Sequence, residues 1–166
     1  MSIANWVAEQ VDVSRDWTKK LLADVTGEEW TFQPAPGIQH VLWLCGHLAV
    51  SEHLLVVTRA LGGEPPDAKF AEHFAIGKPV SAAGDHSYPL AHAVIAQMDA
   101  THAKALAAIR GASDAKLAEP CFGKDGVIHP HYKTVYGAIA HCARHESFHA
   151  GQIAMLRRLQ GKAFLR

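Results

Sequence analysis

The chain has 166 residues and a mass of 18.0 kDa, so we expect one domain, residues 1–166, that folds without disulfides. Its 16 Lys and Arg residues balance 16 Asp and Glu residues, which argues against a phosphate-neutralising surface and hence against nucleic acid as the main partner. The N-terminus has no basic segment followed by an apolar one, no run of about 18 apolar residues occurs, and three cysteines form no framework, so we expect a cytoplasmic protein with no membrane partner.

Two amphipathic helices are predicted in the first half of the chain. The first begins near residue 3 and ends near Gly27, because apolar residues recur at steps of three and four. After a proline-rich turn at residues 34–37, the second runs from about 39 to 61 and stops at a glycine pair. On its helical wheel His47 faces inward, whereas His53 is expected on the surface or at a contact.

Two long connections separate the remaining helices. Residues 62–88 lack a lasting periodicity and are longer than a bundle turn needs, and loops of that length often cover sites. Within them a short helix is expected to pack over a bundle end, carried by Phe70, His73 and Phe74. Ser87 is the predicted cap of a third helix that ends at Gly111. Residues 111–133 then lead to a fourth helix, from about Lys133 to Gln160.

These segments predict the fold class. Four long amphipathic helices, with no convincing strand pattern and no repeat, indicate an all-α protein, specifically a four-helix bundle. The two long connections show that it is not a minimal hairpin bundle.

The stretch from His141 to Gln152 calls for a chemical explanation. Its three histidines, His141, His145 and His149, follow at steps of four, so on a helix they share one side. At about 100° per residue, that side also carries apolar residues. Burying an imidazole there is unfavourable unless its nitrogens find partners. A lone histidine in this setting is most simply a hydrogen-bonded core residue, whereas the spaced pair His145 and His149 indicates a metal site.

Three kinds of metal site use such a pair. His145-Glu146-Ser147-Phe148-His149 satisfies the metalloprotease pattern H-E-x-x-H, but no Asp, Glu or His follows His149 to supply a downstream ligand. A carboxylate-bridged di-metal bundle needs a second Glu-x-x-His and more glutamates than the other helices offer. The third takes its remaining ligand from upstream, where the inward-facing His47 completes a three-histidine site suited to zinc or nickel. Cys142 is expected to be a small buried apolar residue rather than a ligand.

At this point the chain resembles a known family. Residues Trp43 to Ala49 (Trp-Leu-Cys-Gly-His-Leu-Ala) are similar to the second-helix signature of the DinB-like (DinB/YfiT) superfamily. His141, His145 and the run from His149 to Gln152 resemble its fourth-helix signature. The resemblance covers essentially the whole chain and implies an up-down-down-up bundle, a divalent metal at the positions of His47, His145 and His149, and a homodimer.

The resemblance also implies a range of activities. Members with assigned activity include S-transferases and isomerases that use low-molecular-weight thiols, although many members have no assigned reaction. This chain carries Phe148 and Ala150 where many relatives have histidine and arginine, so the substrate of a particular relative does not carry over.

The expected function is therefore a metal-dependent enzyme of the thiol S-transferase type acting on a small electrophilic molecule. Glu146 is a candidate base, with a solvated helix residue as the equally weighted alternative, while His141 and Gln152 are expected to orient a ligand or the substrate. The rival functions are a non-catalytic dimeric stress-response or binding protein with a structural metal, and a metal-dependent hydrolase.

Overall fold

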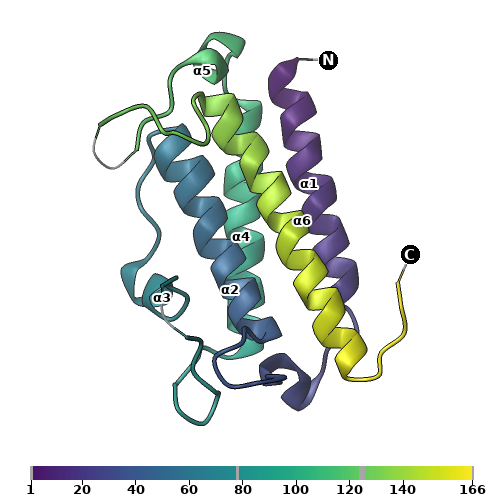
Figure 1. Ribbon diagram of the computed structural model, residues 1–166. Helices are drawn as coiled ribbons and strands as arrows, with labels where there is room; N and C mark the ends of the chain where they lie inside the picture. Colours follow the sequence, from purple (N-terminus) through teal and green to yellow (C-terminus); the bar gives the residue numbers. More distant parts are fainter. Residues whose placement is uncertain (1, 78, 124–125, 166) are drawn as a thin grey trace.

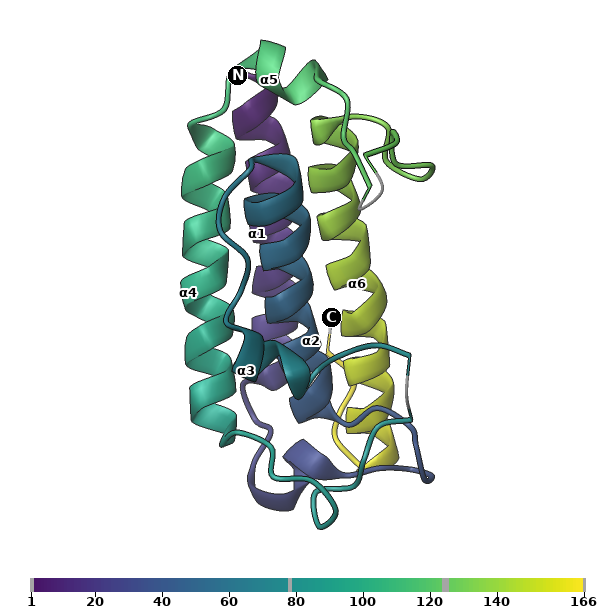
Figure 2. The ribbon, with the colours of Figure 1, turned by 90° about the vertical axis from the view of Figure 1, so that its left-hand side faces the viewer.

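Four long helices form a bundle in the computed structural model, which describes residues 2–77, 79–123 and 126–165. The bundle helices are α1 (Ile3–Leu22), α2 (Val41–Glu52), α4 (Ala91–Arg110) and α6 (Val135–Leu159). A π-helix, η2 (His53–Ala60), continues α2 without a break. Figures 1 and 2 show α1 and α6 running in one direction and α2 and α4 in the other. The predicted four-helix bundle and its up-down-down-up order are confirmed.

Three short helices lie in the connections: η1 (Gly27–Thr31), α3 (Ala68–Glu72) and α5 (Asp114–Ala118). Among the described residues there are isolated β-bridges but no strand. The expected short helix in the 62–88 connection is therefore present as α3, which contains Phe70, whereas His73 and Phe74 follow it.

Two predicted helix boundaries were wrong. The first helix ends at Leu22 rather than near Gly27, because the Glu29 carboxylate accepts a hydrogen bond from the Thr26 amide (2.6 Å) and starts the separate turn η1. Ser87 does not cap the third helix, which begins only after Leu90. Pro89 explains the delay, since a proline pushes the residue before it out of the helical region.

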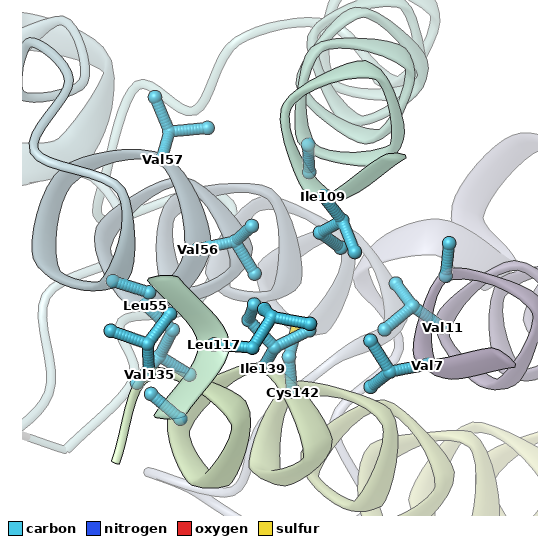
Figure 3. Close-up of a cluster of buried hydrophobic side chains, with 14 of the residues drawn as sticks. Val7, Val11, Leu55, Val56, Val57, Ile109, Leu117, Val135, Ile139 and Cys142 are labelled. Atoms are coloured by element: carbon cyan, nitrogen blue, oxygen red, sulfur yellow. The ribbon is translucent and has the colours of Figure 1, made fainter. Parts of the chain in front are cut away.

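The interior is divided by a layer of charge. Two apolar clusters occupy the two ends of the bundle, and Figure 3 shows the one built around Val7, Val56, Ile139 and their neighbours. Between the residues of the two clusters, each long helix contributes a buried ionisable side chain to one hydrogen-bonded group. These are Arg15 from α1, Glu52 from α2, His102 from α4 and Glu146 from α6. Buried charges need partners, and these four find them in one another.

Gly46 allows the 62–88 connection to pack closely on α2. A Cβ atom at this position would lie 2.3 Å from the ring of Phe74, so only glycine leaves room for the ring. Phe74 is fully buried there and joins the same apolar cluster as Leu44 and Leu48. This contact holds the segment that contains α3 beside the part of α2 that carries His47.

The helical stretch Val41–Ala60 is long and apolar enough to cross a membrane by length and composition alone. Of its most apolar window, 83% is buried inside the bundle, as in the core helix of a soluble protein.

Candidate metal centre

Three histidine side chains from α2 and α6 converge on one point. His47 projects from α2, and His145 and His149 project from successive turns of the antiparallel α6. The Nε2 atom of His145 lies 3.3 Å from Nε2 of His47 and 3.0 Å from Nε2 of His149. All three ligand nitrogens lie within 4.8 Å of one another.

These distances fit a shared metal ion. Imidazole nitrogens bind zinc at about 2.0–2.1 Å, which places two of them about 3.3 Å apart in a tetrahedral site and about 2.9 Å apart at right angles. A neutral imidazole carries only one N–H, so without a cation the Nε2 atom of His145 could not form a good hydrogen bond with both neighbours at once. In at least one of the two contacts, two nitrogen lone pairs would face each other. The donor set therefore suits a divalent ion. Among the described residues no fourth His, Cys, Asp or Glu joins the group.

Burial keeps the three imidazoles neutral, which is the form that binds metal. Burial lowers the pKa of His145 to about 3, with further contributions from its neighbours His149 and His47. It lowers the pKa of His47 to about 4, opposed in part by a hydrogen bond to the backbone of Phe74. The pKa of His149 is also lowered by burial, against the opposing effects of Gln152 and Glu146. At neutral pH the nitrogen lone pairs are available.

Neighbouring groups fix the orientation of the ligands. Oε1 of Gln152 can only accept, so Nδ1 of His149 carries the proton in their 2.5 Å hydrogen bond, and its Nε2 is left to face the other histidines. The ring of Trp43 stacks on His47 with an interplanar angle of 8° and a centroid distance of 4.8 Å. Gln152 thus lies where the sequence predicted a supporting residue.

The family model of the DinB superfamily matches residues 10–153. The chain belongs to the DinB superfamily. The crystal structure of a conserved protein from Enterococcus faecalis has a TM-score of 0.76 at 20% identity, covering 98% of this chain and 99% of that one. At this identity the likeness shows the shared fold alone. None of the curated protein sequences is significantly similar to this chain.

His141 lies one turn of α6 beyond the three converging histidines of this DinB-superfamily protein. Its ring centroid is 6.0 Å from that of His145 and 5.0 Å from that of Tyr132. His141 is outside the group that could share an ion. Its predicted role in orienting a ligand or substrate stays a prediction.

Glu146 is part of the charged layer. It is only 4% exposed, so the alternative of a solvated helix residue is wrong. Its two carboxylate oxygens accept hydrogen bonds from Nε and a terminal nitrogen of Arg15, at 3.0 and 3.1 Å. This geometry directs the carboxylate into the bundle and counts against the predicted role as a base.

Arg15 and Glu52 were missed by the sequence reasoning. Arg15 is 1% exposed and also donates to Glu52, at 2.9 Å, and to the carbonyl of Met98. The signal that could have found Arg15 is its position four residues after the apolar Val11, on the side of α1 that is buried. Glu52 gave a weaker signal, because it follows the inward-facing His47 by five residues and so lies on a different side of a regular α-helix.

The two cysteines nearest the site pack as apolar residues. Cys45 and Cys142 are both buried and free, and burial raises the pKa of each thiol well above its ordinary value. Cys142 lies in an apolar cluster, as expected, and neither thiol belongs to the group of potential ligands.

Proposed function

We propose that the protein is a metal-dependent enzyme of the thiol S-transferase type, with zinc or nickel held by His47, His145 and His149. One observation carries the proposal. Three neutral imidazoles converge, and no fourth side chain among the described residues completes the set. Three protein ligands with a free position are typical of catalytic zinc, whereas structural zinc has four. An ion bound there lowers the pKa of a coordinated thiol or water and polarises a carbonyl.

The chain's own groups supply orientation and shielding. Gln152 holds the tautomer of His149, and stacking on Trp43 fixes the plane of His47. The hydroxyl of Ser51 lies 3.4 Å from Nε2 of His47, beside the nitrogen that would bind the ion, where it can hydrogen-bond a substrate atom. His145 is half-buried, whereas His47 and His149 are buried, so the substrate would reach the ligands next to His145.

The proposed partners are a small electrophilic molecule and a low-molecular-weight thiol. We also propose that the protein acts in the cytoplasm as a homodimer. Three buried, free cysteines are consistent with a reducing compartment.

Two other functions use the same residues. A metal-dependent hydrolase would need the same three ligands and free position, with water in place of the thiol. A non-catalytic binding protein with a structural ion would need a fourth protein ligand, and the exclusion of Cys45 and Cys142 from the ligand group disfavours it.

Elemental analysis combined with a thiol-transfer screen tests the proposal. Protein purified without chelator is expected to hold one zinc or nickel per chain, and His145→Ala or His149→Ala to lose it. His92→Ala is the matched control, because His92 is an exposed histidine on α4. The same samples are then assayed for conjugation of several low-molecular-weight thiols to 1-chloro-2,4-dinitrobenzene and monobromobimane.

The outcomes separate the three functions. Metal-dependent transfer that both alanine variants lose supports the S-transferase. Metal with hydrolysis of activated esters but no thiol transfer supports the hydrolase, and metal with neither activity supports the binding protein. Metal retained by both variants would show that these histidines are not the ligands.

A further inference from the structure

The guanidinium of Arg59, which has no carboxylate partner among the described residues, lies beyond the metal centre toward the C-terminal end of η2. Arg59, in η2, donates a 3.1 Å hydrogen bond to the hydroxyl of Tyr132, and its carbon Cζ lies 5.9 Å from the centre of the Tyr132 ring. In the part of the chain that the structure describes, Arg59 forms no ion pair. The other guanidiniums held inside the fold, Arg15 and Arg157, each have carboxylates.

A row of side chains joins Arg59 to the metal centre along one side of α2. His47, Ser51, Leu55 and Arg59 follow at steps of four residues. In an α-helix each such step drifts by about 40°. The π-helix η2 winds more slowly, as its i→i+5 hydrogen bond from the Leu61 amide to the Val56 carbonyl shows, and this offsets the drift. The row spans at most about 18 Å.

A second row of rings, on α6 and on the loop before it, leads to the same hydroxyl. From His145 the ring of His141 is 6.0 Å away, and from His141 the ring of Tyr132 is 5.0 Å away. His129 stacks on Tyr132 at 3.8 Å and 7°. The ring contacts therefore lead from the metal centre to the hydroxyl that Arg59 contacts.

Among the described residues, Arg59 contacts the hydroxyl and the ring of Tyr132 rather than a carboxylate. A half-buried guanidinium in such surroundings attracts an anion, and its planar fork suits carboxylate or phosphate oxygens.

We propose that Arg59, with the hydroxyl of Tyr132, binds the anionic end of the molecule on which the metal centre acts. The ligand class is a small elongated molecule with its reactive atom at one end and a carboxylate or phosphate group at the other. This inference rests on the proposed function, because it takes the three histidines as the reacting end of the site. It also gives the π-helix a role, since η2 places Arg59 in line with His47.

The simplest competing role for Arg59 is structural, namely fastening the loop before α6 to the end of η2 through Tyr132. Tyr132→Phe separates the two roles. It removes both the fastening hydrogen bond and the hydroxyl but keeps the charged guanidinium, so with the proposed anion subsite it weakens anion binding less than Arg59→Gln does. If Arg59 only fastens the loop, Arg59→Gln and Tyr132→Phe will lower the melting temperature equally and neither will change anion binding.

The test is an NMR titration of metal-loaded protein with inorganic phosphate and, separately, with succinate. The Nε–H signal of Arg59 is expected to shift and saturate with one or both anions, which also tells phosphate from carboxylate recognition. Arg59→Gln is expected to weaken the binding about tenfold or more, as for loss of a hydrogen bond to a charged group. The matched control Arg158→Gln removes the same charge from an exposed position of α6 and is expected to bind like the wild type.

His145→Ala distinguishes failure of this inference from failure of the proposed function. The variant is expected to lose the metal but to keep the anion affinity of Arg59 within about twofold, because the guanidinium makes no contact with His145. Equal shifts of the Arg59 and Arg158 signals, or unchanged anion affinity in Arg59→Gln, would overturn the anion subsite even if the histidines bind metal.

Discussion

Replacing Arg15 with methionine should destabilise the protein strongly, because two carboxylates would remain buried without their cation. Burial opposes the charge of Arg15, but Glu52 and Glu146 outweigh that effect and raise its pKa. The guanidinium makes three hydrogen bonds to these carboxylates, whose side chains are 2% and 5% exposed. Removing one partner of a buried ion pair costs about 3–5 kcal/mol. For a domain of this size the melting temperature should fall by roughly 10 °C.

Urea unfolding and calorimetry of Arg15→Met measure this cost. Lys19→Met is the matched control on the same helix, because Lys19 pairs with Asp99 at 2.8 Å with both side chains about half exposed. An exposed pair of that kind contributes about 0–1 kcal/mol. Adding Glu52→Gln and Glu146→Gln to Arg15→Met should recover much of the loss. A cost for Arg15→Met no larger than that of Lys19→Met would refute the account of the charged layer.

Three further predictions follow from single contacts. Gln152→Leu leaves Nδ1 of His149 without its acceptor and should weaken metal binding about 10- to 100-fold in a chelator-competition titration; unchanged affinity would contradict the orienting role. Gly46→Ala places a methyl group against Phe74 and should cost about 1–3 kcal/mol in thermal unfolding, and wild-type stability would show that the close packing is misjudged. For His102, burial lowers the pKa, but the hydrogen bond and charge of Glu52 more than reverse this and raise it. The contribution of charged His102 to the free energy of unfolding should be complete below about pH 6.5 and be lost as the pH rises through the folded-state pKa. The difference in the free energy of unfolding between wild type and His102→Gln should therefore become smaller toward alkaline pH. A difference in the free energy of unfolding that does not change with pH would count against the charged form of His102.

The helical periodicity was enough to predict the four long helices and the inward direction of His47. A four-residue spacing fixes which side of a helix a residue occupies, so His145 and His149 could be paired before any tertiary contact was known. Local rules failed where two signals competed. Ser87 is a good cap by residue type, but Pro89 moved the start of α4 beyond it.

The environment of Glu146 could not be read from α6 alone. Its neighbour His145 and its place in H-E-x-x-H indicated chemistry, whereas its burial depends on Arg15, which is 131 residues away in the chain. His53 shows the same limit. The helical wheel predicted it on the surface or at a contact, and it is buried with a hydrogen bond to the carbonyl of Glu64, in the connection that follows η2. A helical wheel gives the side of the helix on which a residue lies but not which loop covers that side.

X-ray absorption at the zinc or nickel edge of the metal-loaded protein tests the central claim most directly. We expect three imidazole nitrogens at about 2.0–2.1 Å with no sulfur in the resting protein, and a sulfur at about 2.3 Å only after a low-molecular-weight thiol is added. Loss of the imidazole signal in His47→Ala as well as in His145→Ala would complete that result. A resting spectrum with fewer than three imidazoles, or with protein sulfur closing a four-ligand shell, would contradict it.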